Sequence, residues 1–279
     1  GVVAISDGDE FIDSAALMRN VMRYSRMFDL PIMTHCEDRS LSGKGVMNEG
    51  YTASCLGLSG MPREAEELQV ARNILLAEIT GARLHIAHVS TGGSVRMVRD
   101  AKKRGLQVTC ETCPHYFALT EEAVEDYNTF AKVNPPLRTQ EDVEAILEGI
   151  ADGTIDAIAS GHSPTSRTDK DKEFGNAAYG ISALETAFPI SFTKLVETGI
   201  ISLARLVELM SKNPAEILKL EQKGEIAVGK DADLIVIETK GTQIIEPELF
   251  ASKAKFSPFA GQEVKGRVVY TIVGGKIVS

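Results

Sequence analysis

The chain has 279 residues, of which 43% are hydrophobic, and it carries a formal net charge of −9. This length suits one large domain or a barrel with a small satellite, and the apolar content is sufficient to fill a core. An acidic surface repels phosphate backbones and anionic lipids, so we expect neither nucleic acid nor a membrane surface as a partner. No apolar run approaches the roughly 20 residues that a membrane-spanning helix requires.

Cysteine usage indicates a reducing compartment. The cysteines are few for a chain of this length, so we expect no disulfide framework and a cytoplasmic protein. Cys110 and Cys113 have the spacing of half a zinc site, but no second Cys or His pair follows at the spacing of a zinc finger. We therefore expect both to be ordinary strand cysteines.

Strand-like and helix-like patterns alternate over most of the chain. The sequence opens at Gly1 directly on a run that predicts a buried strand, so we expect further residues upstream of it. In chain order, strands are predicted at Gly1–Ser6, Pro31–His35, Leu84–Val89, Gln107–Thr112 and Asp156–Ser160.

Helical periodicity connects these strands. The first helix has Met18, Val21, Met22 and Ser25 on one face, and the helix at Arg63–Thr80 has a recurring stripe of Leu68, Ala71, Leu75 and Ile79. This alternation predicts a parallel sheet, because parallel strands need a helical crossover. A complete TIM-type (β/α)8 barrel takes roughly 250 residues. We therefore expect an α/β fold over residues 1–220, either a TIM-type barrel or the C-terminal five strands of one.

The pattern changes after Gly224. Two β-rich segments, Asp233–Glu238 and Lys265–Val278, alternate with glycine turns. Residues 221–279 are therefore expected to form a small C-terminal β domain of the sandwich type, an antiparallel sheet that takes partner strands from upstream residues.

Histidines supply the first candidate metal ligands. His35 and His88 each end a predicted strand, and a barrel builds its active site at the C-terminal ends of its strands. Imidazole is a common zinc ligand, so two of them at neighbouring strand ends could share an ion. For any single histidine, a hydrogen-bonded structural role is the alternative. His85 lies on the same strand as His88, and alternation predicts that it faces the helices.

Other polar residues near strand ends could complete a site. Asp7 and Asp9 follow the first strand, and a carboxylate there can bridge metals or act as a general base, although loop acids are more often solvated. Asn134 stands in a proline-rich turn, where its amide could contact a ligand or stabilise the turn. Tyr179 and Gly180 could bring bare backbone close to a substrate, because glycine lets main chain approach closely.

Several motifs resemble those of dihydroorotases. They are His35-Cys-Glu-Asp38, Gly45-Val-Met-Asn-Glu-Gly50, His85-Ile-Ala-His88-Val-Ser-Thr91, Asn134-Pro-Pro-Leu-Arg138 and Asp152-Gly-Thr-Ile-Asp-Ala-Ile-Ala159. The first and third, in this order, are specific to that family, and the resemblance extends over essentially the whole chain. It implies a zinc-dependent cyclic amidohydrolase on a TIM barrel, which interconverts N-carbamoyl-L-aspartate and L-dihydroorotate in pyrimidine synthesis.

Carried over residue by residue, the resemblance implies metal-ligand positions at His35 and His88. It also implies substrate contacts at Asn134, Tyr179 and Gly180. The small-molecule substrate would then meet both sets of residues in one cavity.

The sequence departs from the family at its most reactive positions. The family's His-x-His-x-Arg pair is absent, and a gap-free alignment of its Asp-Asp-Gly run places Gly8 on the bridging aspartate. Asp7 or Asp9 can substitute only with a shift. The family's catalytic aspartate falls on Gly161, and its last substrate-contacting histidine falls on Thr165. No catalytic residue is therefore intact, and we expect weak or absent zinc binding with Asp7 as the third ligand.

Three functions follow from these observations. The chain is a dihydroorotase altered at its site, a non-catalytic paralogue that acts as a scaffold for aspartate transcarbamoylase, or a binding module without turnover. We expect a homo-oligomer in each case. Metal content and a ring-hydrolysis assay separate the first from the others, and co-purification with a partner separates the second from the third.

Overall fold

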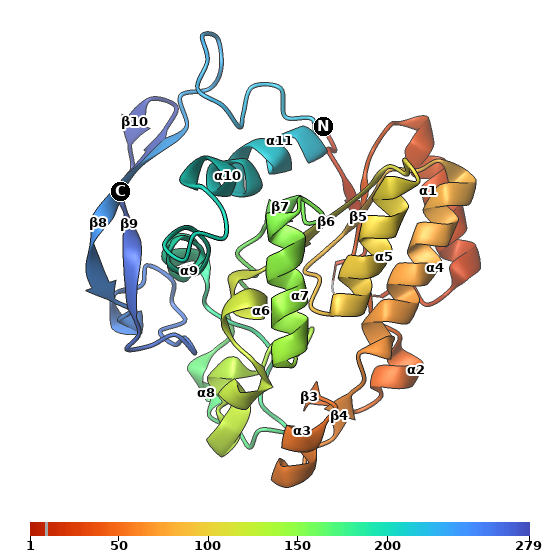
Figure 1. The fold of residues 1–279 in the computed structure, drawn as a ribbon, viewed down its shortest axis with the longest axis horizontal. Helices are drawn as coiled ribbons and strands as arrows, with labels where there is room; N and C mark the ends of the chain where they lie inside the picture. Colours follow the sequence, from red (N-terminus) through yellow and green to blue (C-terminus); the bar gives the residue numbers. More distant parts are fainter. Residues whose placement is uncertain (9–10) are drawn as a thin grey trace.

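The computed structural model describes residues 1–8 and 11–279, and its centre is a five-stranded parallel sheet (Figure 1). The strands, in spatial order, are β1 (Ile5–Ser6), β2 (Ile32–Thr34), β5 (Leu84–Ile86), β6 (Val108–Thr112) and β7 (Ala157–Ile158). Neighbouring strands run parallel throughout. The predicted strands and their α/β arrangement are confirmed.

The first strand is shorter and more exposed than predicted. Only Ile5 and Ser6 pair with β2, and the side chains of Val2 and Val3 are 72% and 44% exposed. The prediction of a buried strand from Gly1 onwards is therefore wrong. The reason is that β1 stands at an edge of the sheet, where only β2 pairs with it among the described residues.

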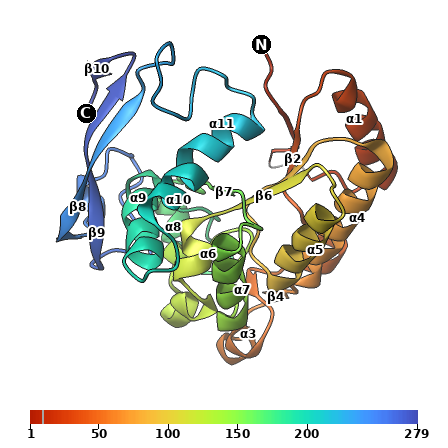
Figure 2. The same cartoon turned by 45° about the horizontal axis from the view of Figure 1, so that its top comes forward.

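Helices cover one face of the sheet side by side (Figures 1 and 2). They are α1 (Ala15–Met27), α4 (Glu64–Thr80), α5 (Gly92–Lys103) and α7 (Gln140–Ala151), and each contacts the next. The Ser14 side chain caps α1 by accepting a hydrogen bond from the backbone N–H of Leu17. As predicted, α1 buries Met18, Met22 and Ser25.

The apolar stripe predicted on α4 faces solvent. Leu68, Leu75 and Ile79 are 53%, 56% and 63% exposed. The buried face is a different one, on which polar residues such as Glu66 and Asn73 alternate with apolar residues such as Val70 and Ile74. Both polar side chains form hydrogen bonds with residues at strand ends. Glu66 accepts from the backbone of Ser90 and Thr91, and Asn73 donates to Thr34. Polar side chains can be buried when their hydrogen bonds are satisfied, which is why apolar periodicity alone does not identify the inner face of this helix.

Short elements fill the connections that follow the strands. Between β2 and α4 lie α2 (Arg39–Ser42), β3 (Met47–Asn48), α3 (Tyr51–Leu56) and β4 (Gly60–Met61), and β3 pairs in parallel with β4. Between β6 and α7 lie α6 (Pro114–Ala118) and the 3-10 turns η1 (Glu121–Tyr127) and η2 (Thr129–Ala131). After β7 come α8 (Arg167–Lys170), α9 (Leu184–Ser191), η3 (Phe192–Val196), α10 (Leu203–Val207), η4 (Glu208–Lys212) and α11 (Asn213–Ile217), of which η3 and η4 are π-helical.

The end of the chain forms an antiparallel sheet on the side of the molecule opposite α1 (Figure 1). Its strands are β8 (Leu234–Ile244), β9 (Glu263–Val273) and β10 (Lys276–Ile277), in the order β10-β9-β8, and the 3-10 turn η5 (Pro247–Leu249) lies between the first two. Gly266 lets β9 approach η3, because a Cβ there would lie 2.9 Å from the Phe192 ring. The expected β-rich end is thus a single sheet within the described residues.

The hydrophobic core lies between the parallel sheet and the helices. Met18 and Met22 of α1, Leu84 and Ile86 of β5 and Ile146 of α7 belong to one cluster of buried side chains. Burial of each such side chain contributes roughly 1.5–3 kcal/mol. The four cysteines are free. No described helix is both long and apolar enough to cross a membrane.

Candidate active-site cavity

A cavity of about 590 Å³ opens at the C-terminal ends of the parallel strands. Every strand of that sheet contributes to its wall, through Gly8 after β1, His35 after β2, His88 after β5, Glu111 on β6 and Ala159 after β7. Barrel-type α/β enzymes build their sites at this end. The volume is within the range of roughly 300–1,000 Å³ that is typical of small-molecule sites.

His35 and His88 meet in this cavity. The Nδ1 atom of His35 lies 3.4 Å from both ring nitrogens of His88. The backbone of His88 is left-handed, with φ of 38°, which redirects its side chain just past the end of β5. Burial, together with the neighbouring His35, lowers the pKa of His88 to about 3. The predicted proximity is confirmed, and the role of the pair as metal ligands stays a prediction.

The two imidazoles fit a shared ion, but they do not complete a site. Two nitrogens bound to one tetrahedral zinc at roughly 2.0–2.1 Å would lie roughly 3.4 Å apart. In residues 1–8 and 11–279, however, no group of three or more His, Cys, Asp or Glu side chains is arranged to hold a metal. Catalytic zinc sites use three protein ligands. The described residues therefore do not fit a complete catalytic zinc centre.

Asp7 anchors the end of β2. Its carboxylate accepts hydrogen bonds from the backbone N–H of His35 and from Thr34 Oγ1, both at 3.0 Å. Burial raises the pKa of Asp7, although these hydrogen bonds oppose the shift. Gly8, and not Asp7, lines the cavity. Asp9 lies outside the described residues.

His85 does not face the helices, contrary to prediction. Its Nδ1 atom lies 2.8 Å from Thr109 Oγ1, and its Nε2 atom lies 3.3 Å from Glu111 Oε2. Glu111 lines the cavity, whereas Leu84 and Ile86 on either side of His85 belong to the hydrophobic core. Alternation failed because the left-handed backbone at His88 breaks the strand geometry between the two histidines.

Glu37 links the end of β2 to the loop that carries Asn134. Its carboxylate accepts a hydrogen bond from Asn134 Nδ2 at 2.8 Å and lies 3.3 Å from Nε2 of His35. Burial raises the pKa of Glu37, but hydrogen bonds from His35, Ser42 and Asn134 outweigh that effect and lower it to about 2. Asn134 lines the cavity and uses its amide nitrogen to hydrogen-bond Glu37, and its contact with a substrate stays a prediction.

Tyr179 and Gly180 also line the cavity. The Tyr179 hydroxyl donates to the Gly45 carbonyl at 2.8 Å, and the Gly180 N–H donates to the Lys132 carbonyl at 3.0 Å. Only glycine fits at 180, because φ is 129° and a Cβ would lie 2.1 Å from the carbonyl oxygen of Ser163. The close backbone approach predicted here therefore occurs within the chain itself.

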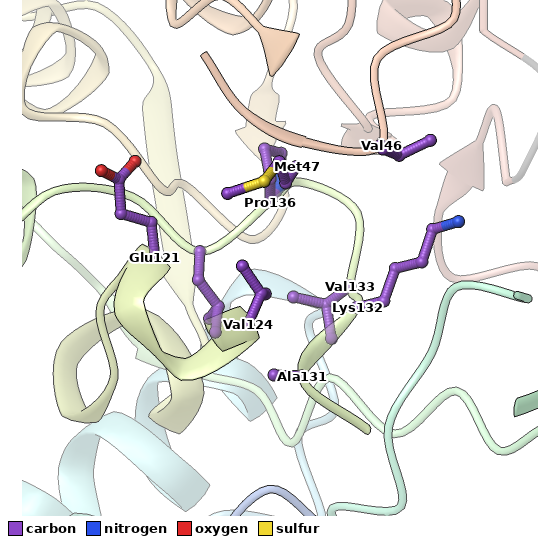
Figure 3. Close-up of a pocket in the computed structure, with 9 residues that line it drawn as sticks. Val46, Met47, Glu121, Val124, Ala131, Lys132, Val133 and Pro136 are labelled. Atoms are coloured by element: carbon purple, nitrogen blue, oxygen red, sulfur yellow. The ribbon is translucent and has the colours of Figure 1, made fainter. Parts of the chain in front are cut away.

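Two buried lysines bind backbone carbonyls near the wall of the cavity. Lys170 Nζ donates to the carbonyls of Thr129 and Lys132, at 2.9 and 3.0 Å. Lys132 Nζ donates to the Phe174 carbonyl at 2.6 Å and lies 4.7 Å from the centroid of the Tyr179 ring. Figure 3 shows a separate pocket beside this segment, from which the Lys132 amine extends away. The two side-chain amines thus hold backbone that forms part of the cavity wall.

Gly161 borders the cavity without room for a side chain. A Cβ there would lie 2.6 Å from Cε1 of His115 and 2.8 Å from Sγ of Cys113, and φ is 64°. Thr165, the other departure from the family pattern, is not among the lining residues, and its hydroxyl is buried without a hydrogen-bond partner in the described part of the chain.

Sequence reasoning missed several cavity residues. Glu111, Cys113, His115 and His162 all line the wall. A signal was present for two of them, because Glu111 and Cys113 sit at the C-terminal end of a predicted strand, as His35 and His88 do. His162 accepts a hydrogen bond at Nδ1 from the backbone N–H of Ala183, at 3.0 Å.

Comparisons of the sequence give consistent relatives. The family profile described as Amidohydrolase family matches residues 1–278. A dihydroorotase from Acetivibrio thermocellus is 49% identical over 278 residues, which are 100% of this chain and 65% of that protein. One from Caldanaerobacter subterraneus subsp. tengcongensis is 52% identical over 277 residues, or 99% of this chain and 64% of that protein. The chain thus spans slightly less than two thirds of the length of these curated relatives.

Solved structures share the fold. The L-hydantoinase (dihydropyrimidinase) from Arthrobacter aurescens matches with a TM-score of 0.87 at 29% identity, over 99% of this chain and 63% of that one. The dihydropyrimidinase from Brevibacillus agri matches with a TM-score of 0.87 at 24% identity, over 99% of this chain and 62% of that one. The second match concerns the fold alone.

Proposed function

The chain belongs to the amidohydrolase family, and from that premise we propose that it is a dihydroorotase-type cyclic amidohydrolase. Its substrates would be L-dihydroorotate and N-carbamoyl-L-aspartate, and its setting pyrimidine synthesis in the cytoplasm. One observation carries the proposal. A single cavity is lined by the five positions at which this chain matches dihydroorotase motifs, namely His35, His88, Asn134, Tyr179 and Gly180.

The cavity offers hydrogen-bond acceptors suited to a ureide. Asn134 uses its amide nitrogen on Glu37, so its Oδ1 atom remains to accept from a ligand N–H. Gly180 uses its N–H on Lys132, so its carbonyl is the backbone group left for a ligand. The ring of dihydroorotate presents two N–H groups, and its open form presents a ureido N–H and NH₂. Two acceptors on one wall therefore suit either compound.

We include zinc in this proposal, although the described residues supply only part of a set of ligands. His35 and His88 would be two ligands, because their nitrogens have the spacing of a shared ion. Asp7 is the third candidate, but it must exchange one of its present hydrogen bonds to bind a metal.

A second candidate is a non-catalytic scaffold, with aspartate transcarbamoylase as the partner. The observation that favours it is Gly161, where His115 and Cys113 occupy the space that the family's aspartate would need. A chain that cannot accommodate the proton-transferring carboxylate can still retain its fold for assembly. Under either candidate we propose a homo-oligomer, with a barrel portion at residues 1–220 and a β domain at 221–279.

Calorimetry with the purified chain tests the first candidate. We expect L-dihydroorotate and N-carbamoyl-L-aspartate to bind, and Asn134→Ala to weaken both by about tenfold, since a lost hydrogen bond is worth about one decade of affinity. Hydantoin and dihydrouracil, which carry no carboxylate, are the comparison ligands. Binding of these two in place of the acids would reassign the substrate. Co-purification with aspartate transcarbamoylase, without binding of any of the four compounds, would favour the scaffold.

A further inference from the structure

His115 is a buried imidazole with no protein partner for its Nδ1 atom among the described residues. It is the second residue of α6, its side chain is 3% exposed, and it lines the cavity. Most buried polar groups are hydrogen-bonded. Of the described buried side-chain atoms without a partner, only Nδ1 of His115 belongs to a residue that lines the cavity, where a water or a ligand can complete it.

The position of the ring within the cavity is specific. Its Cε1 atom, which lies between the two ring nitrogens, is 2.6 Å from where a Cβ of residue 161 would be. The thiol of Cys113 lies 2.8 Å from the same point. Gly161, Cys113 and His115 therefore share one small region of the wall, and glycine leaves that region to the imidazole.

The charge state of His115 is compatible with recognition of an amide. Burial lowers the pKa of His115 to about 3, so the ring is neutral at pH 7. A neutral imidazole has one N–H donor and one lone-pair acceptor. A cyclic amide likewise presents an N–H donor beside a carbonyl acceptor, so the ligand can satisfy the nitrogen that the protein leaves unpaired.

We propose that His115 is a ligand-contacting residue, whose imidazole takes the place of a side chain at position 161 and hydrogen-bonds the amide or ureido group of the substrate. The proposal rests on the proposed function, because it takes the cyclic amide as the ligand. It adds a specificity-determining contact that the matched motifs do not include.

A ligand-contacting role and a structural role predict opposite effects on stability. If His115 serves the ligand, the free protein carries an unsatisfied buried nitrogen, and removal of that nitrogen does not destabilise it. If His115 is structural, its removal lowers the melting temperature. His85 is the control, because it is an equally buried histidine that does not line the cavity. Its Nε2 atom also lacks a hydrogen bond, but it lies 3.3 Å from Glu111 Oε2, and its Nδ1 atom bonds Thr109, so both of its nitrogens have a protein neighbour that its removal would leave unpaired.

The experiment compares His115→Leu, His115→Asn and His85→Leu with the unmodified chain. Calorimetry measures the Kd for L-dihydroorotate and N-carbamoyl-L-aspartate, and thermal unfolding without ligand measures Tm. For His115→Leu we expect at least about tenfold weaker binding and a Tm equal to or above that of the unmodified chain. His115→Asn, which keeps a polar atom near Nδ1, should recover part of the affinity. His85→Leu should lower Tm and leave Kd unchanged.

Two results overturn the inference alone. In the first, the unmodified chain binds and His115→Leu binds as tightly. In the second, His115→Leu loses as much Tm as His85→Leu, which would make the imidazole structural. If the unmodified chain binds neither compound, the proposed function is overturned, and this inference falls with it.

Discussion

Asn134 donates a hydrogen bond from Nδ2 to Oε2 of Glu37 at 2.8 Å, so a carboxylate after β2 orients the amide that faces the cavity. Glu37 also lies 3.3 Å from His35, so it contacts both a candidate ligand-binding residue and a candidate metal ligand. Ionised Glu37 is the form that accepts these hydrogen bonds, so the stability that they provide depends on pH.

Glu37→Gln should reduce stability at neutral pH and flatten its acid dependence. The folded pKa of Glu37, about 2, lies below its ordinary value of 4.5. Its stabilisation is therefore fully present above about pH 4.5 and is lost as pH falls towards about 2. We expect a loss on the order of 2 kcal/mol at pH 7, measured by urea unfolding across this range. The exposed Glu122→Gln is the control, and equal pH profiles for all three proteins would contradict the prediction.

Gly161→Asp should not restore hydrolysis of dihydroorotate. The new Cβ would overlap His115 and Cys113, so we expect a lower Tm and negligible turnover. Gly8→Asp is the matched control. A Cβ there would meet nothing within 4 Å, and aspartate tolerates its φ of 58°. A well-folded Gly161→Asp protein with substantial turnover would refute this account.

The unmodified chain should retain less than one zinc per molecule after dialysis, because His35 and His88 supply only two ligands. Gly8→Asp should raise the retained zinc, since it adds a carboxylate at the end of β1, where Gly8 lines the same cavity. Elemental analysis measures both, with His88→Ala in the Gly8→Asp background as the control that should lose the gain. Stoichiometric zinc in the unmodified chain would promote Asp7, or Asp9 outside the described residues, to a ligand.

The stability of the chain should rise with pH between about 7 and 10.5, through Lys170. Burial, with a smaller effect from the charge of Lys132, lowers the pKa of Lys170 from 10.5 to about 7. Across this window the unfolded chain binds the proton that the folded chain has released, so rising pH favours folding. Lys170→Met should reduce this slope, leaving the part due to Lys132, whose pKa burial lowers to about 8, while the exposed Lys172→Met should keep it. An unchanged slope in Lys170→Met would show that another group titrates.

The sequence by itself determined the parallel α/β alternation and the placement of His35 and His88 at strand ends. Both are local properties. Periodicity identifies a strand or helix from neighbouring residues, and parallel strands place their carboxyl ends at one edge. The motifs also named Asn134, Tyr179 and Gly180, which line one cavity.

Only the tertiary structure decided which side chains converge and which faces are buried. α4 buries Glu66 and Asn73 because strand ends offer them hydrogen bonds, and no pattern within the helix records those partners. The prediction for His85 was wrong because the left-handed backbone of His88, beyond the strand, interrupts the alternation between the two residues. His115 lines the cavity beside Gly161, which is distant in sequence and leaves space for its ring. Such placements depend on packing between distant segments, which local periodicity does not encode.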